Sequence, residues 1–182
     1  MARILVLYGS TESQTAKIAE FLATVLKQHG QTVSVVDSEF IPGSFTLNDY
    51  DVALIGASMH AGGFQRAVQN FVGQQQASLN QMPSAFFSVS LTAAYPTPEG
   101  RSQLDSHLER FFAETGWHPQ QVVNFAGALA YSQYHGLKRW AMLRIAHDVH
   151  APTDTSHDYE YTDWEAVTRF AEAMLAVPLA QG

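Results

Sequence analysis

The chain has 182 residues, of which 46% are hydrophobic and 15% charged, so it can bury one sizeable core and is not a disordered chain. Its 17 acidic side chains outnumber the 10 lysines and arginines, and the net charge of −7 argues against nucleic acid as the main partner, because phosphate backbones bind basic surfaces. The absence of cysteine excludes disulfides, zinc–thiolate sites, iron–sulfur ligation and thiol nucleophiles, so any redox chemistry must come from a bound cofactor.

Short apolar runs alternate with segments of helical periodicity along the chain. In chain order, the pattern predicts a strand at 4–8, a helix at 15–29, strands at 32–36 and 52–57, a helix at 64–76, a strand at 84–89, a helix at 102–115 and a strand at 122–128. Thr162-Asp163-Trp164-Glu165 then predicts a capping box, in which the Thr162 hydroxyl and the Glu165 carboxylate bind free amides of a last helix. This alternation predicts the α/β class, with a parallel sheet covered by helices on both faces.

The sequence begins with a strand-like run and lacks the basic and apolar regions of a signal peptide. No apolar stretch reaches the roughly 18 residues that span a bilayer. We therefore expect a cytoplasmic protein, and peripheral contact with the inner face of the cell membrane is left open.

One segment, 129–161, does not fit the alternation of strands and helices. It is too long for an ordinary connection, so it is either functional or poorly ordered. Its stretch 136–146 carries three of the ten basic residues and no acid. This mixture of basic and apolar side chains suits a membrane surface or a large anionic, planar substrate, and a packed helix with a solvated basic side is the alternative. The residues concerned are Lys138, Arg139, Trp140 and Arg144.

A loop rich in hydroxyl and amide side chains follows the first strand and leads directly into a helix. It has neither the Gly-Lys pair of a P-loop nor the Gly-x-Gly-x-x-Gly of a dinucleotide site. Neutral donors at a helix N-terminus suit one terminal phosphate, and an ordinary helix cap without a ligand is the alternative. The loop reads Ser10-Thr11-Glu12-Ser13-Gln14-Thr15.

This loop resembles the FMN phosphate loop of the flavodoxin family, Ser/Thr-x-Thr-Gly-x-Thr. Ser10, Gln14 and Thr15 fit the motif, whereas Glu12 and Ser13 replace a hydroxyl and the usual glycine. Since a carboxylate repels a phosphate dianion, we expect Glu12 to point away from the phosphate. The resemblance implies one flavodoxin-like domain over 1–182, with a five-stranded parallel sheet of order 2-1-3-4-5 and FMN at its switch point.

Two further loops, after the third and fourth strands, would cover the flavin ring in such a fold. Small residues in them let the backbone approach the ring, while Met59, His60 or Tyr95 would supply a contacting side chain; a surface position for Tyr95 is equally open. No general base can be assigned from the sequence. His60 is the candidate because it titrates near neutrality, against a structural or solvated histidine. The full set of cofactor contacts expected here is Ser58, Met59, His60, Ser88, Ser90, Leu91, Thr92, Tyr95 and, after the fifth strand, Gly127.

Longer motifs resemble the quinone-dependent (menaquinone-dependent) protoporphyrinogen IX dehydrogenases. They are Ile55-Gly56-Ala57-Ser58, the runs 80–89 and 126–131, Thr153-Asp154-Thr155 and the run 161–165. The resemblance implies an FMN enzyme of haem biosynthesis that removes six electrons from protoporphyrinogen IX and passes them to a membrane quinone. An electron-carrier flavodoxin and an NAD(P)H:quinone reductase are the rival interpretations. The quinone and the oligomeric state are left open.

Eight histidines raise the question of a metal site. His147-Asp148-x-His150, with His157 nearby, is the one cluster, and its spacing is not the i,i+4 pair of a helical zinc site. We therefore expect no metal ion.

Overall fold

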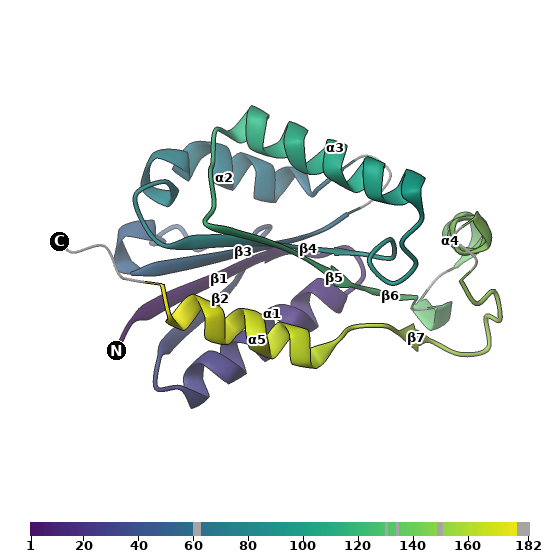
Figure 1. Ribbon diagram of the computed structural model, residues 1–182, viewed down its shortest axis with the longest axis horizontal. Coiled ribbons are helices and arrows are strands. Elements are labelled where there is room, and N and C mark those ends of the chain that lie inside the picture. The colour runs from purple at the N-terminus through teal and green to yellow at the C-terminus, as the bar shows by residue number, and fades with distance from the viewer. Residues whose placement is uncertain (60–62, 130, 134, 149–150, 178–182) are drawn as a thin grey trace.

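A five-stranded parallel sheet of order β2-β1-β3-β4-β5 forms the centre of the protein (Figure 1), which confirms the predicted class and strand order. The computed structural model describes residues 1–59, 63–129, 131–133, 135–148 and 151–177. The strands are β1 (Arg3–Gly9), β2 (Thr32–Asp37), β3 (Val52–Ser58), β4 (Ser84–Ser90) and β5 (Gln121–Ala126).

Helices cover both faces of this sheet. α1 (Gln14–Gln28) and α5 (Trp164–Leu175) lie on one face, and α2 (Arg66–Leu79) and α3 (Pro98–Thr115) lie on the other (Figure 1). Every residue of β3 and β4 is buried, as expected for central strands packed on two sides. A short 3-10 turn, η1 (Leu47–Asp49), precedes β3.

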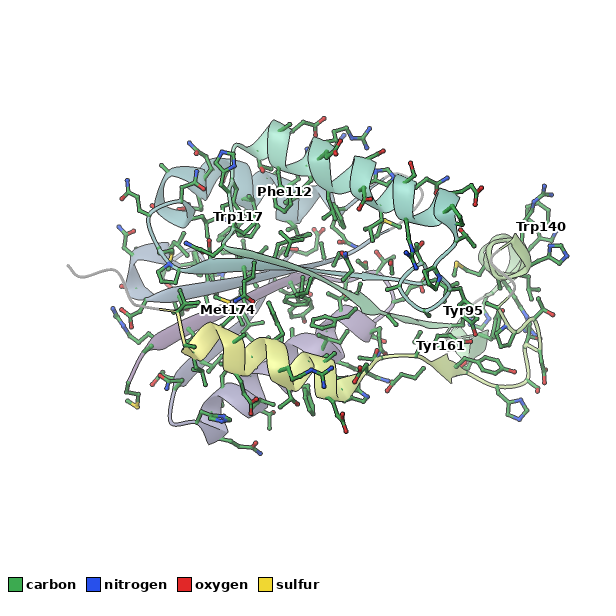
Figure 2. All side chains as sticks on the ribbon, in the orientation of Figure 1. Tyr95, Phe112, Trp117, Trp140, Tyr161 and Met174 are labelled. Atoms are coloured by element: carbon green, nitrogen blue, oxygen red, sulfur yellow. The ribbon has the colours of Figure 1, made fainter. Side chains whose placement is uncertain are left out.

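Each face of the sheet has its own apolar core. The α1–α5 side contains Ile18, Leu22 and Phe170 around β1 and β4. On the other side Trp117 is fully buried beside Phe86 and Phe112, and its indole nitrogen donates to the Ser84 hydroxyl at 3.0 Å (Figure 2). This rigid framework fixes the loops at the carboxyl ends of the strands, where the site lies.

Two predicted helix starts are wrong. α3 begins at Pro98, not at 102, because Thr97 caps it by accepting from the Gly100 amide at 3.0 Å and proline favours the first helical position. The capping box at α5 is also wrong: Asp163 is the N-cap and accepts from the Ala166 amide at 3.0 Å. The Thr162 hydroxyl is thereby released for other contacts.

The segment after β5 forms a small unit of its own, which we call the insertion (residues 127–161). It contains β6 (Ala128–Leu129), η2 (Tyr131–Gln133), α4 (Gly136–Asp148) and β7 (Tyr159–Glu160), and β6 pairs antiparallel with β7. The predicted strand 122–128 thus ends at 126, and β6 belongs to a separate two-stranded sheet with β7. The unit lies beyond the carboxyl end of the sheet (Figure 1). In the described part of the chain, no helix has the length and apolarity to cross a membrane.

Candidate functional site

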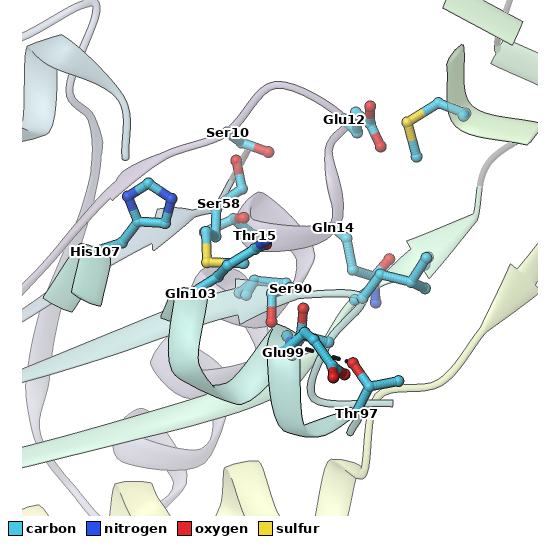
Figure 3. A pocket seen from close by; sticks show the side chains of 18 residues that line it. Ser10, Glu12, Gln14, Thr15, Ser58, Ser90, Thr97, Glu99, Gln103 and His107 are labelled. Carbon is cyan, nitrogen blue, oxygen red and sulfur yellow. Dashed lines mark hydrogen bonds between the residues drawn. The ribbon is translucent and has the colours of Figure 1, made fainter. Parts of the chain in front are cut away.

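A cavity of about 730 Å³ lies at the carboxyl ends of β1, β3 and β4, a size typical of a small-molecule or cofactor site. Side chains converge on it from the loop before α1, from the ends of β3 and β4, and from α3 (Figure 3). The insertion completes the wall. The lining residues are Ser10, Glu12, Gln14, Thr15, Ser58, Met59, Val89, Ser90, Leu91, Thr92, Thr97, Glu99, Gly100, Gln103, His107, Gly127, Ala128 and Met142.

The loop before α1 presents hydrogen-bond donors that the protein itself does not use. The hydroxyls of Ser10 and Thr15 are buried and have no hydrogen-bond partner among the residues that the structure describes, and Thr15 is only 1% exposed. A buried polar group without a partner is costly, so these two oxygens indicate a ligand with acceptor atoms. Both are expected site residues, and both line the cavity.

The first turn of α1 is also left without a side-chain cap. Ser13 is the N-cap, yet its hydroxyl donates to the carbonyl oxygen of Glu12 at 2.6 Å instead of accepting from a helix amide. The first turn carries no acidic residue. Free amides at a helix N-terminus carry partial positive charge and attract anions. The turn therefore offers a phosphate group both donors and a favourable field.

Ser13 departs from the flavodoxin motif in residue type but not in backbone conformation. Its φ of 65° lies in the left-handed region, and within the residues the structure describes it is the one non-glycine residue there. Glycine adopts this conformation without cost, which explains why the motif favours glycine at this position. In this loop a serine holds the left-handed conformation, with some strain.

The orientation of Glu12 relative to a bound phosphate stays a prediction. Glu12 is half-buried and lines the cavity, although Figure 3 shows its carboxylate away from the Ser10 and Thr15 hydroxyls. Within the described part of the wall, Glu12 and Glu99 are the two carboxylates, and no lysine or arginine is among these described lining residues. A phosphate here would be held by neutral donors and backbone amides, not by cations.

A glutamine that the sequence did not single out joins two of the predicted loops. Gln65, just before α2, donates from its amide nitrogen to the Thr11 hydroxyl at 3.1 Å and also to the Ser58 hydroxyl. The same side chain leaves Oε1 buried without a partner. Gln65 therefore holds the loop before α1 against the end of β3.

Several predicted residues lie elsewhere. Ser88 is fully buried in β4, where its hydroxyl donates to Asn124, and it does not line the cavity. Tyr95 also lies outside the lining and packs edge-on against Tyr161, with ring centroids 5.2 Å apart (Figure 2). His60 lies outside the residues that the structure describes.

The basic face of α4 lies at the surface. Trp140 is 61% exposed, Arg139 and Arg144 are exposed, and Arg139 donates to the Thr155 hydroxyl. None of the three lines the cavity, whereas Met142 of the same helix does. The side chain of Lys138 is not among those described.

The wall contributed by α3 was missed in the sequence. Glu99, Gln103 and His107 lie four residues apart and therefore on one helical face, which borders the cavity. With the helix predicted to begin at 102, the first of them falls outside it and the pattern is hidden. The Arg110 guanidinium lies 3.5 Å from His107 Nδ1, beside this face of the helix.

The insertion packs on the β4–α3 loop through aromatic side chains. Tyr131, Tyr159 and Tyr161 form a group with Tyr95 around the fully buried Leu129. Burial raises the pKa of Tyr161 well above its ordinary value, so the phenol stays protonated at neutral pH. Tyr95 thus anchors the insertion rather than facing the cavity.

A metal site has no support in the described residues, where no group of three or more His, Asp or Glu side chains gathers around a point. His150 of the predicted cluster lies outside the residues that the structure describes.

Comparison with known proteins defines the class. A family model described as a flavodoxin domain matches residues 5–156. The structure is similar to a flavodoxin of Streptococcus pneumonia TIGR4, with a TM-score of 0.59 and 18% identity over 96% of this chain and 99% of that chain. Oxidised Flavodoxin 1 from Bacillus cereus gives a TM-score of 0.59 and 16% identity over 97% and 99% of the two chains. The fold is therefore that of a flavodoxin.

Curated relatives define the particular family. A protein of Escherichia coli (strain K12) named protoporphyrinogen IX dehydrogenase (quinone) is 37% identical over 170 residues, 93% of this chain and 92% of its own length. A protein of the same name from Leishmania major is 36% identical over 182 residues, 98% of this chain and 77% of its own length. The chain belongs to the protoporphyrinogen IX dehydrogenase (quinone) family of flavodoxin-like oxidoreductases.

Proposed function

We propose that the protein binds FMN and uses it to oxidise protoporphyrinogen IX to protoporphyrin IX, with a quinone as the final electron acceptor. The observation that carries the proposal is the pair of buried, unpartnered hydroxyls of Ser10 and Thr15 beside the uncapped first turn of α1. The terminal phosphate of FMN supplies the acceptor oxygens and the negative charge that this turn lacks. The reaction is inferred from membership of the protoporphyrinogen IX dehydrogenase (quinone) family.

The chain's own residues bind and orient the cofactor. Ser10, Thr15 and the first amides of α1 hold the phosphate, and Gln65 keeps this loop against β3. When bound, FMN supplies a hydride acceptor for the bridge carbons of the substrate. Six other lining residues flank the ring and keep water from it: Ser58, Met59, Ser90, Leu91, Thr92 and Gly127.

The charges around the cavity favour one orientation of the substrate. Because no lysine or arginine is among the described lining residues, the two propionates of a tetrapyrrole find no cation in the part of the wall that the structure describes. Arg139 and Arg144 on the exposed side of α4 are the cations we assign to them, while Met142 of the same helix contacts the tetrapyrrole body. Exposed Trp140 lies between these arginines in sequence and would touch the membrane that holds the quinone.

An anaerobic turnover assay tests the proposal. FMN-loaded protein is mixed with protoporphyrinogen IX, and porphyrin fluorescence is followed with and without added quinone. We expect fluorescence to grow over many turnovers only when quinone is present, with enzyme-free and FMN-only mixtures as controls. Loaded protein that produces no porphyrin above these controls would contradict the proposal and leave a flavodoxin that carries electrons.

A further inference from the structure

The two ends of the insertion meet beside the first turn of α1. β6 pairs antiparallel with β7, and the Tyr161 amide donates to the carbonyl oxygen of Gly127 at 3.1 Å. The incoming segment 126–129 and the outgoing segment 159–162 therefore run together, and we call them the neck. The rest of the insertion, α4 included, lies between these two segments in the chain.

A chain of two hydrogen bonds ties the neck to α1. The Thr162 hydroxyl donates to the carbonyl oxygen of Ala126 at 2.8 Å and accepts from the amide nitrogen of Gln14 at 2.8 Å. Since a carbonyl cannot donate, the one hydroxyl hydrogen goes to Ala126, and Gln14 must present its NH₂ group. The orientation of both side chains is thereby determined.

Gln14 belongs to the phosphate end of the cavity as well as to the neck. It is the first residue of α1, lines the cavity and is only 6% exposed. Its neighbour Thr15 carries one of the two unpartnered hydroxyls. The first turn of α1 therefore carries a phosphate donor, Thr15, directly beside Gln14, the residue that binds the neck.

The insertion in turn borders the mouth of the cavity. Gly127 and Ala128 of the neck and Met142 of α4 all line it. The insertion also packs around Tyr95 of the β4–α3 loop, which runs beside the same cavity. A shift of the neck would therefore displace the wall against which a planar substrate must lie.

We propose that Thr162 is a positioning residue, which acts through Gln14 to couple phosphate binding at α1 to the placement of the insertion over the cavity. The inference rests on the proposed position of the FMN phosphate. Phosphate oxygens that accept hydrogen bonds from the Thr15 hydroxyl and the first amides of α1 hold the first turn of this helix in place. The neck is hydrogen-bonded to the same turn through Thr162 and Gln14. Such coupling is reciprocal, so an insertion detached from Gln14 weakens FMN binding too.

Limited trypsin digestion tests this coupling without any substrate turnover. Trypsin cleaves after lysine and arginine, and exposed Arg139 and Arg144 make α4 a reporter of the insertion. We expect saturating FMN to slow cleavage within α4 by about fivefold or more. Riboflavin, which has the same ring but no phosphate, should protect much less.

Variants then locate the coupling. Thr162→Val keeps the shape of the side chain but removes the hydroxyl, and it should abolish the protection by FMN; Thr162→Ser keeps the hydroxyl and should restore it. Lys17→Met is the matched control, because it removes only the exposed 3.4 Å ion pair between Lys17 and Glu160 at the same neck. Exposed ion pairs contribute little to stability, so FMN should still protect Lys17→Met from cleavage. If Thr162→Val does not fold, Gln14→Met breaks the same bond from the other side.

Equal protection of wild-type protein and Thr162→Val, with FMN bound in both by absorbance, would overturn the proposal. So would equal protection by riboflavin and FMN. In the enzyme, Thr162→Val should raise the KM for protoporphyrinogen IX by about fivefold or more and change kcat less. The digestion needs no porphyrin, so absence of turnover would contradict the proposed function and leave the coupling result standing.

Discussion

Replacing Thr15 by valine should have opposite effects on the stability of the flavin-free protein and on its affinity for FMN. The Thr15 hydroxyl is buried, unpartnered and part of the cavity wall, and valine has nearly the same shape. A buried polar group left unpaired costs about 1–3 kcal/mol, and this cost disappears in Thr15→Val. For a chain of this length, each kcal/mol corresponds to a rise of about 2–4 °C in Tm.

Thr15→Val should also weaken FMN binding. A hydrogen bond to a charged group contributes about 1.5–3 kcal/mol, and at about 1.4 kcal/mol per tenfold the dissociation constant should rise about 10- to 150-fold. Thermal unfolding of the flavin-free protein and titration of flavin fluorescence measure the two effects. The control is Thr24→Val, an exposed position on the same helix whose hydroxyl donates to the Glu20 carbonyl oxygen at 2.9 Å. Thr24→Val should change neither quantity appreciably. A flavin-free Thr15→Val protein that is less stable than wild type, or unchanged FMN affinity, would refute the reasoning.

Three further predictions concern the loop before α1, the core and the insertion. Ser13→Gly should stabilise the flavin-free protein by about 0.5–1 kcal/mol in thermal unfolding, because glycine accepts the φ of 65° that strains serine; a Ser13→Gly protein less stable than Ser13→Ala would contradict this. Gly56→Ala should cost about 1–3 kcal/mol or more in denaturant unfolding, since the added Cβ would lie 2.0 Å from the Phe87 ring. Gly73→Ala, an exposed helical position with open space around it, should be neutral or stabilising, and equal effects at both positions would refute the packing argument. Hydrogen bonds from the Ser132 hydroxyl and amide hold the pKa of Asp158 below 3.8, so folding favours its carboxylate. The stability that the Asp158 carboxylate adds to the fold is present above its unfolded pKa and is lost as pH falls through its folded pKa. The Tm difference between wild type and Asp158→Asn should therefore shrink below about pH 4. A Tm difference that stays constant with pH would contradict this role of Asp158.

The layered sheet was predictable because its signal is local. β1 and β3 are near-continuous apolar runs, and such runs separated by helical periods specify a parallel sheet with covered faces. The loop before α1 was found for the same reason, because it directly joins a buried strand to a helix. Even the missed start of α3 had a local signal in Thr97-Pro98, a cap followed by proline at the first helical position.

The rest of the site depends on contacts between distant parts of the chain. Tyr95 packs on Tyr161, 66 positions later, and no local pattern distinguishes that arrangement from one in which Tyr95 faces a flavin. The Gln14–Thr162 bond spans 148 positions, and a capping motif in the sequence assigned the Thr162 hydroxyl to a different partner. Unpartnered hydroxyls are a property of packing, so only the structure distinguishes Ser10 and Thr15 from ordinary capping residues.

Reaction of protoporphyrinogen IX with the bound flavin, in the absence of quinone, is the direct test of whether this protein oxidises the substrate through FMN. FMN-loaded protein is mixed anaerobically with protoporphyrinogen IX, and flavin absorbance and porphyrin fluorescence are recorded together; quinone is then added. Because each flavin accepts two of the six electrons, we expect the flavin colour to be lost on mixing and to return when quinone is added, with porphyrin fluorescence growing from that point, and we expect Thr15→Val to lose flavin more readily during the cycle. Flavin that keeps its colour in the presence of protoporphyrinogen IX would contradict the account.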